Sequence, residues 1–130
     1  MGIILVAEDD ESIRDFVSFA LEADNHDIVT ADEGGEAYRQ LLENPENFDL
    51  LIADIQMPVM NGLELAAKVS EKVPDLPILL ISGAMEELDR ADKLGDVVEG
   101  VLQKPFTLEQ IRLEVNEILG LEAKEEAEND

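Results

Sequence analysis

Short apolar runs alternate with segments of helical periodicity along almost the whole chain, and this alternation constrains the fold more than any other feature. The first run, Ile3–Ala7, is a continuous apolar stretch of the kind found in strands that are buried on both faces. Similar runs follow at residues 28–31, 50–53, 78–81 and 101–102, the first of these being weaker. A helical segment follows each run, so the sequence predicts five strands that alternate with five helices.

The helical segments carry apolar stripes and recognisable end signals. The stripe of the first helix consists of Ile13, Phe16, Val17, Ala20 and Leu21. Further helices are predicted at residues 33–44, 61–73, 86–94 and 107–119. Asp32 and Asn61 have the side chains expected of N-caps for two of these helices. Thr107 and Gln110, three residues apart, form a capping-box pattern at the start of the last helix.

Connections that alternate in this way produce a parallel sheet with helices on both faces. Five such units in 130 residues match an α/β fold of the flavodoxin-like, doubly wound type, (βα)5 with strand order 2-1-3-4-5. We expect one domain over residues 1–120. Residues 121–130 contain five acids, one lysine and no apolar stripe, which predicts a flexible acidic C-terminal tail.

The charge and the cysteine content exclude several classes of function. The chain has 32 acidic and 9 basic residues, a net charge of -23, so it lacks the basic footprint that nucleic acids and anionic membrane surfaces require. The absence of cysteine excludes disulfides, thiolate zinc sites and cysteine nucleophiles. No apolar run is long enough to span a membrane, and the start MGIILV lacks the basic region of a signal peptide. We therefore expect a cytoplasmic protein.

Polar residues lie at the ends of four of the predicted strands. The acidic run Glu8–Glu11 follows the first strand, Asp54 the third, Ser82 and Gly83 the fourth, and Lys104 the fifth. Each of them has a plain structural explanation when it is considered alone, as a solvated turn, a helix cap or a turn former. Their common position, at the edge where this fold binds its ligands, favours a functional interpretation.

Together these residues resemble the components of a phosphoryl-transfer site. The ends of the first and third strands are neighbours in this fold, so Glu8, Asp9 and Asp54 should crowd one pocket. Such carboxylates raise one another's pKa unless a cation lies between them. Carboxylate oxygens that leave some coordination positions free for water suit Mg2+. Lys104 would add a positive charge and Ser82 a hydroxyl group. Phosphoryl transfer needs this set, since it depends mostly on positioning and charge neutralisation.

The four strand-end motifs resemble those of response-regulator receiver domains, the CheY-like modules of two-component signalling. They are ILVAEDDESIR, LLIADIQMPVMNG, LLISGA and LQKPF, and the resemblance covers residues 3 to about 120. The motif AEDDESIR, together with SGA and KPF, is similar to the corresponding motifs of CpdR-type receivers. Since no output domain follows the last helix in this sequence, we expect a stand-alone, single-domain regulator.

The resemblance implies a role for each residue. Asp54 corresponds to the phosphoacceptor, Lys104 and Ser82 to the groups that contact the phosphoryl oxygens, and Gly83 to the small residue that leaves space for them. Mg2+ would be bound by Asp9, Asp54 and the backbone carbonyl of Gln56, with Glu8 or Asp10 acting through water. The resemblance also implies a cis peptide bond between Lys104 and Pro105. One position departs from the family, because Val101 replaces the aromatic ring that usually takes part in switching.

The resemblance implies partners as well as chemistry. A sensor histidine kinase or a histidine phosphotransfer protein would supply the phosphoryl group. A downstream protein would bind the surface of the fourth helix, fifth strand and fifth helix, where acids gather: Glu86, Glu87, Asp89, Asp92, Asp96 and Glu99. That partner should present a basic surface, and its binding should weaken as salt is added.

Three other functions compete with this interpretation. A flavodoxin-like electron carrier would need a hydroxyl-rich phosphate loop after the first strand, where this chain has EDDE, and aromatic rings around the flavin. A phosphatase of the haloacid dehalogenase type would need a DxD motif on the first strand. A receiver-fold adaptor that binds its partner without phosphorylation remains the main alternative, because of Val101.

Overall fold

The computed structural model describes residues 2–83 and 97–120. Its elements are β1 (Ile3–Ala7), α1 (Glu11–Glu22), β2 (Asp27–Ala31), α2 (Gly34–Glu43), β3 (Leu50–Asp54), α3 (Gly62–Lys72), β4 (Ile78–Ser82), β5 (Gly100–Gln103) and α5 (Leu108–Leu119). The predicted strands and four of the predicted helices are confirmed. The helix predicted at residues 86–94 and the predicted tail at 121–130 lie outside the described residues.

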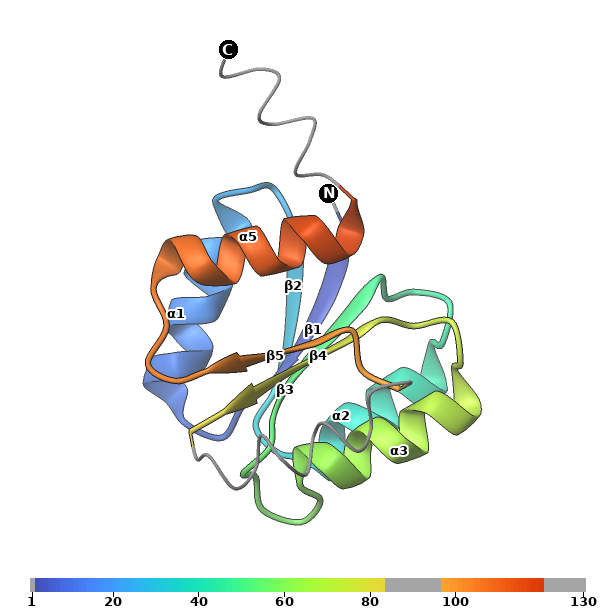
Figure 1. Cartoon of the computed structure of the whole chain (residues 1–130). Coiled ribbons are helices and arrows are strands. Elements are labelled where there is room, and N and C mark those ends of the chain that lie inside the picture. Colours follow the sequence, from blue (N-terminus) through green and yellow to red (C-terminus); the bar gives the residue numbers. More distant parts are fainter. Residues whose placement is uncertain (1, 84–96, 121–130) are drawn as a thin grey trace.

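The five strands form one parallel sheet in the order β2-β1-β3-β4-β5, as predicted (Figure 1). In Figure 1, α1 and α5 cover one face of the sheet, and α2 and α3 cover the other. Each residue of β3 and β4 is buried, which explains why these strands are continuous apolar runs. The carboxyl ends of all strands meet at one edge, and this brings together the residues that follow them.

Two hydrophobic cores lie on opposite faces of the sheet, because successive side chains of a strand point to opposite sides. In β1, Leu5 and Ala7 pack on the side of α2 and α3, whereas Ile4 and Val6 pack on the side of α1 and α5. Among the described residues, no helix combines the length and the apolar character that crossing a bilayer would require.

Side-chain caps fix the beginnings of the helices. The predicted N-caps Asn61 and Thr107 are confirmed, and each completes a capping box with the residue three positions on. The prediction of Asp32 as a cap is wrong. Glu33 caps α2 instead, because its longer side chain reaches the backbone N–H of Glu36 at 2.9 Å.

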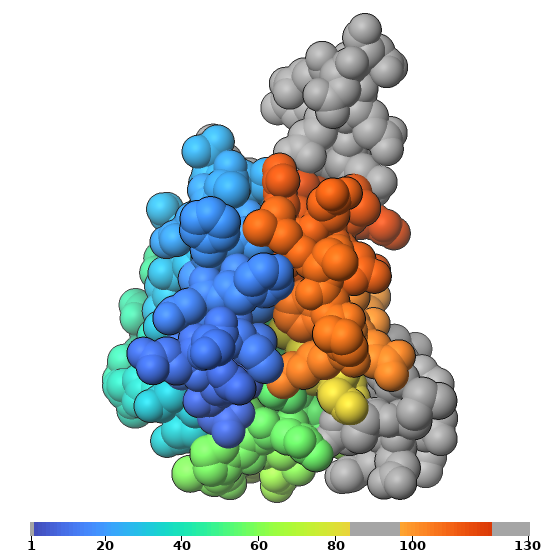
Figure 2. All heavy atoms as spheres, turned by 90° about the vertical axis from the view of Figure 1, so that its left-hand side faces the viewer, coloured from blue at the N-terminus to red at the C-terminus, as the bar shows by residue number. Residues whose placement is uncertain are grey.

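A partly buried ion pair joins α5 to the end of α1, and these two helices lie side by side in Figure 2 (orange and blue). Arg112 of α5 donates two hydrogen bonds to Asp24, which follows α1, with a distance of 2.9 Å from Nε to Oδ2. These hydrogen bonds lower the pKa of Asp24, whereas its burial acts in the opposite direction. The buried Asn116 also donates to Asp24, so this corner of the fold depends on one carboxylate.

Replacing Arg112 by Met should lower the free energy of unfolding by about 2 kcal/mol, because the carboxylate of Asp24 would stay buried without its cation. The loss is moderate since the Arg112 side chain is partly exposed. Urea unfolding measures it. Arg39→Met is the matched control, because Arg39 pairs with Glu36 and Glu43 on the exposed face of α2 and should leave stability unchanged within error. Equal losses in both variants would contradict the structural role of the Asp24–Arg112 pair.

Candidate functional site

Three carboxylates meet at the carboxyl edge of the sheet, as the sequence predicts. Glu8 and Asp9 follow β1, and Asp54 is the last residue of β3. Each contributes a carboxylate oxygen to a group whose members all lie within 4.8 Å of one another. Glu8 and Asp54 are 1% and 2% exposed, whereas Asp9 is open to solvent. The arrangement is a half-open acidic pocket.

Lys104 supplies the positive charge of this pocket. Its Nζ lies 2.6 Å from Oδ2 of Asp54 and 3.3 Å from Oε1 of Glu8. The backbone N–H of Lys104 donates to the carbonyl of Ser82 at 2.7 Å, so β5 holds the lysine against the end of β4. The peptide bond between Lys104 and Pro105 is cis, as the resemblance implies.

Both oxygens of Asp54 accept a hydrogen bond. Oδ2 accepts from Lys104, and Oδ1 accepts from the backbone N–H of Gln56 at 3.0 Å. Gln56 has an exposed side chain. Ser82 ends β4 at the same edge of the sheet and is fully buried, while Gly83 after it is exposed. A Cβ atom on Gly83 would lie 3.7 Å from Cδ of Lys104, so this glycine borders the lysine stem.

The excess of carboxylates changes how the pocket binds protons. Burial, together with the hydrogen bond and the negative charge of Asp54, raises the pKa of Glu8 to about 8. Burial would lower the pKa of Lys104, but the hydrogen bond and the charges of Asp54 and Glu8 outweigh burial and raise it. Lys104 therefore remains charged, and its single charge does not fully offset the two buried carboxylates.

The donor set of the pocket fits a divalent cation. Oε1 of Glu8 is buried, and Nζ of Lys104 lies 3.3 Å from it. Carboxylate oxygens at short range, one of them on an exposed side chain, are the ligands that Mg2+ takes while it keeps several waters. The acidic cluster is thus of the kind that binds Mg2+.

Asp10 has a structural role that the sequence analysis did not assign. Its carboxylate accepts hydrogen bonds from the backbone N–H groups of Ser12 and Ile13 and so caps α1. The signal was present, since an aspartate before a helical stripe is a typical N-cap. Because Asp10 adjoins Glu8 and Asp9, the sequence favoured a role beside the metal ion instead.

Val101 lies in β5 and is half-buried against the core on the side of α2 and α3. Its small side chain therefore packs as a core residue here. The role of this position in switching is not tested by the described residues.

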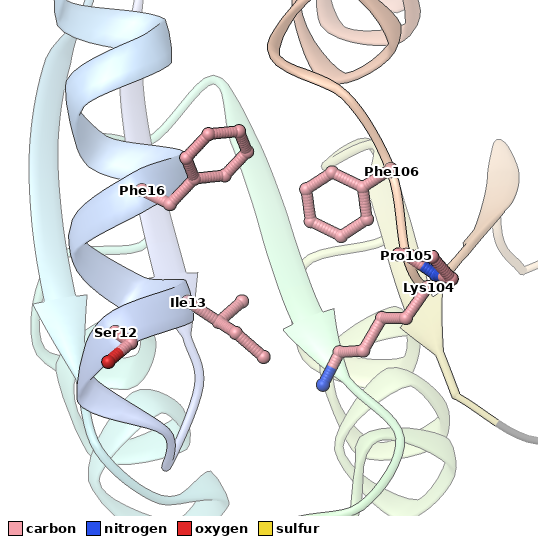
Figure 3. Close-up of a pocket in the computed structure, with 6 residues that line it drawn as sticks. All are labelled: Ser12, Ile13, Phe16, Lys104, Pro105 and Phe106. Atoms are coloured by element: carbon pink, nitrogen blue, oxygen red, sulfur yellow. The ribbon is translucent and has the colours of Figure 1, made fainter.

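An apolar groove opens beside the pocket (Figure 3). It has a volume of about 420 Å³ and is lined by Ser12, Ile13, Phe16, Lys104, Pro105 and Phe106. The rings of Phe16 and Phe106 lie 6.1 Å apart, between their centroids, on opposite sides of the groove. Phe16 belongs to the predicted apolar stripe of α1, but it is 38% exposed because it lies at the edge of that stripe. The sequence pattern does not predict this groove.

The fold and the acidic pocket together define a class of signalling receiver, and comparison with known proteins agrees. Residues 4–116 match the family described as "Response regulator receiver domain", and the chain belongs to this family. Receiver domains are signalling phosphoacceptors rather than classical enzymes, and they are partners of histidine kinases. The chain is thus a receiver-domain response regulator, and its acidic pocket is consistent with a phosphoacceptor site.

Among individual proteins, the chain is similar to the response regulator receiver protein CpdR of Brucella abortus. The two are 40% identical over 119 residues, which cover 92% of this chain and 98% of CpdR. This agrees with the CpdR-type motifs of the sequence. The chain is 30% identical over 116 residues to the alkaline phosphatase synthesis transcriptional regulatory protein PhoP of Bacillus subtilis, covering 89% of this chain but only 48% of PhoP.

A solved structure shows the same fold. The response regulator TrrA of Thermotoga maritima, crystallised in complex with Mg2+ and BeF, superposes with a TM-score of 0.81 and 30% identity, covering 91% of this chain and 99% of TrrA. The fold comparison therefore supports the predicted receiver architecture over nearly the whole chain.

The raised pKa of Glu8 predicts how the stability of the metal-free protein depends on pH. Between pH 4.5 and about 8 the folded chain holds a proton on Glu8 that the unfolded chain releases, so this group's contribution to stability falls as the pH rises. Urea unfolding at several pH values, with a chelator present, measures the effect. Glu8→Gln cannot release that proton and should show a flatter profile over the same range. Parallel profiles for the two proteins would contradict the assignment.

Proposed function

We propose that this chain is a single-domain response regulator that accepts a phosphoryl group from phosphohistidine onto Asp54. One observation carries the proposal: Asp54 is a buried carboxylate, at the carboxyl edge of the sheet, that lies 2.6 Å from an ammonium group and beside two further acids. The coverage of CpdR over 98% of its length supports the single-domain form. A cytoplasmic location is part of this proposal, because the proposed donor and target are the protein partners of a receiver domain.

In the proposed reaction, an oxygen of Asp54 attacks the phosphorus atom in line. A bond forms between phosphorus and the aspartate oxygen, and the bond from phosphorus to the histidine nitrogen breaks. Lys104 and Ser82 neutralise and orient the phosphoryl oxygens, and Gly83 leaves space for them. Water later hydrolyses the acyl phosphate and restores the carboxylate.

Asp9, Asp54 and the backbone carbonyl of Gln56 would hold Mg2+, with Glu8 acting through water. When bound, Mg2+ supplies positive charge that offsets the carboxylates and the incoming phosphoryl group. The magnesium-bound structure of TrrA, and the three carboxylates whose oxygens lie within 4.8 Å of one another in the described part of this chain, support this assignment.

Phosphorylation would shift an existing equilibrium between two conformations of a protein-binding surface. We place this surface on β5, α5 and residues 86–94, the segment for which the sequence predicts the fourth helix. Glu99, Glu109 and Glu117 are exposed on its described part. The downstream partner is therefore a protein with a basic surface, rather than a nucleic acid or a membrane.

Incubation with acetyl phosphate and Mg2+ should add one phosphoryl group per chain, because a small phosphodonor needs no protein partner. Mass spectrometry measures the gain, and alkaline treatment should remove it, as expected of an acyl phosphate. Asp54→Asn should gain none, and removal of Mg2+ by a chelator should abolish the gain in the wild type. Equal labelling of Asp54→Asn would place the phosphate elsewhere.

The same measurement decides between this function and the adaptor that works without phosphorylation. A wild-type chain that gains no phosphate from acetyl phosphate or from any histidine kinase, yet still binds a protein target, would support the adaptor.

The apolar groove lies where the phosphodonor must approach. Lys104 lines the groove with its stem and contacts Asp54 with its ammonium group, so a protein that brings a phosphohistidine to Asp54 passes over Phe16 and Phe106. We include docking of the donor's apolar helix surface in this groove as part of the proposed function.

Phe16→Ser should slow phosphotransfer from a phosphorylated histidine kinase about tenfold, because the donor loses an apolar contact at the groove. Phosphorylation by acetyl phosphate should be unchanged, since that donor does not dock. Leu113→Ser is the matched control, as Leu113 is exposed on α5 and is absent from the groove lining. Both rates follow from time courses of labelling. A similar slowing in both variants, or with both donors, would contradict docking in the groove.

A further inference from the structure

The loop between β3 and α3 follows Asp54 and carries the carbonyl of Gln56. Both of its ends are fixed by hydrogen bonds. The N–H of Gln56 donates to Asp54, and the N–H of Gly62 donates to the carbonyl of Ile55 at 2.9 Å. The position of the Gln56 carbonyl therefore depends on the part of the loop between these two anchors.

The tip of this loop is a strained turn. The N–H of Met60 donates to the carbonyl of Pro58 at 2.7 Å, and Val59 between them has a φ of 69°. These two features define a γ-turn with a positive φ at its centre, the rare and strained form. Val59 is β-branched, which makes a positive φ more costly, and it is 81% exposed, so burial of its side chain does not offset the strain. Another contact must hold the turn.

The first turn of α2 provides that contact. A Cβ atom on Gly34 would lie 2.0 Å from the carbonyl oxygen of Met60 and 2.9 Å from its carbonyl carbon. Gly34 is buried, so the backbone of α2 packs directly on the backbone of the loop, with no room for a side chain. At Gly35 the nearest atoms belong to side chains and not to the loop backbone: Oε1 of Glu33, which caps α2, at 2.9 Å, and Cγ1 of Val59 at 3.2 Å.

We propose that Gly34 is a positioning residue for the Mg2+ site. The close packing of Gly34 on Met60 holds the strained turn, and the turn fixes the direction of the Gln56 carbonyl. This inference rests on the proposed binding of Mg2+ by that carbonyl. Because coupling is reciprocal, Mg2+ in the pocket also restrains the amino end of α2.

Gly34→Ala tests the inference, with Gly35→Ala as the matched control in the same helical turn. The methyl group at position 34 pushes the Met60 carbonyl away and displaces the loop, so the dissociation constant for Mg2+ should rise about tenfold, as when a group that supports a metal ligand is lost. The methyl group at position 35 meets the capping side chain of Glu33 but leaves the Met60 carbonyl in place. It should leave the constant unchanged within error, so it separates a disturbed cap from a displaced loop. Calorimetric titration of the whole chain with MgCl2 measures both.

A second pair of variants covers the case in which Gly34→Ala fails to fold. Glycine adopts a positive φ without strain, so Val59→Gly alone should keep the Mg2+ affinity of the wild type. Added to Gly34→Ala, it lets the turn move away from the new methyl group. The double variant should fold, as judged by circular dichroism, and should still bind Mg2+ about tenfold more weakly.

The outcomes separate this inference from the proposed function. A wild-type chain that binds no Mg2+ overturns both. A wild type that binds Mg2+, with a folded Gly34→Ala or double variant of equal affinity, overturns only the positioning role. Equal weakening by Gly34→Ala and Gly35→Ala also overturns it, because the loss would then follow from any change in the first turn of α2.

Discussion

The crowding of carboxylates at one point of the sheet edge is the constraint on which the site depends. Glu8 and Asp54 are buried beside each other and Asp9 lies within reach, so charges of one sign share a region of low dielectric. Lys104 contacts two of the three, yet the pKa of Glu8 stays raised to about 8. Burial and the neighbouring Asp54 thus make Glu8 hold a proton in the absence of metal. A divalent cation would stabilise the charged form of Glu8 instead, and this physical reason for Mg2+ does not depend on any comparison with relatives.

The strands could be predicted because a strand buried on both faces leaves a continuous apolar run in the sequence. The N-cap residues predicted the helix starts less reliably. Asn61 and Thr107 are N-caps as predicted, since a residue three positions on completes each capping box. Asp32 and Glu33 are adjacent acids, and the pattern could not tell which of them reaches the first turn of α2. That choice depends on the path by which the chain leaves β2, which no short sequence window contains.

In the site, too, some features follow from the sequence pattern and others depend on how the chain packs. Glu8, Asp9, Asp54 and Lys104 were expected to meet because parallel strands carry their carboxyl ends to one edge, and they do meet. The groove beside Phe16 and the packing of Gly34 on Met60 were not predicted. Each of these features joins segments whose contact depends on the packing of the finished fold. The topology of a sheet can be predicted from its pattern, whereas the contacts between its loops require coordinates.

The two hydrogen bonds accepted by Asp54 differ in how easily they can be given up. The hydrogen bond from the Gln56 N–H comes from the backbone and orients the carboxylate. The hydrogen bond from Lys104 comes from the end of a flexible side chain that is 23% exposed. In the proposed reaction, Asp54 must turn an oxygen toward phosphorus, so the ammonium group must pass from that oxygen to the phosphoryl group. The stem of Lys104 also lines the groove. A donor docked there would touch the side chain that has to move, which physically connects recognition of the donor with the reactivity of Asp54.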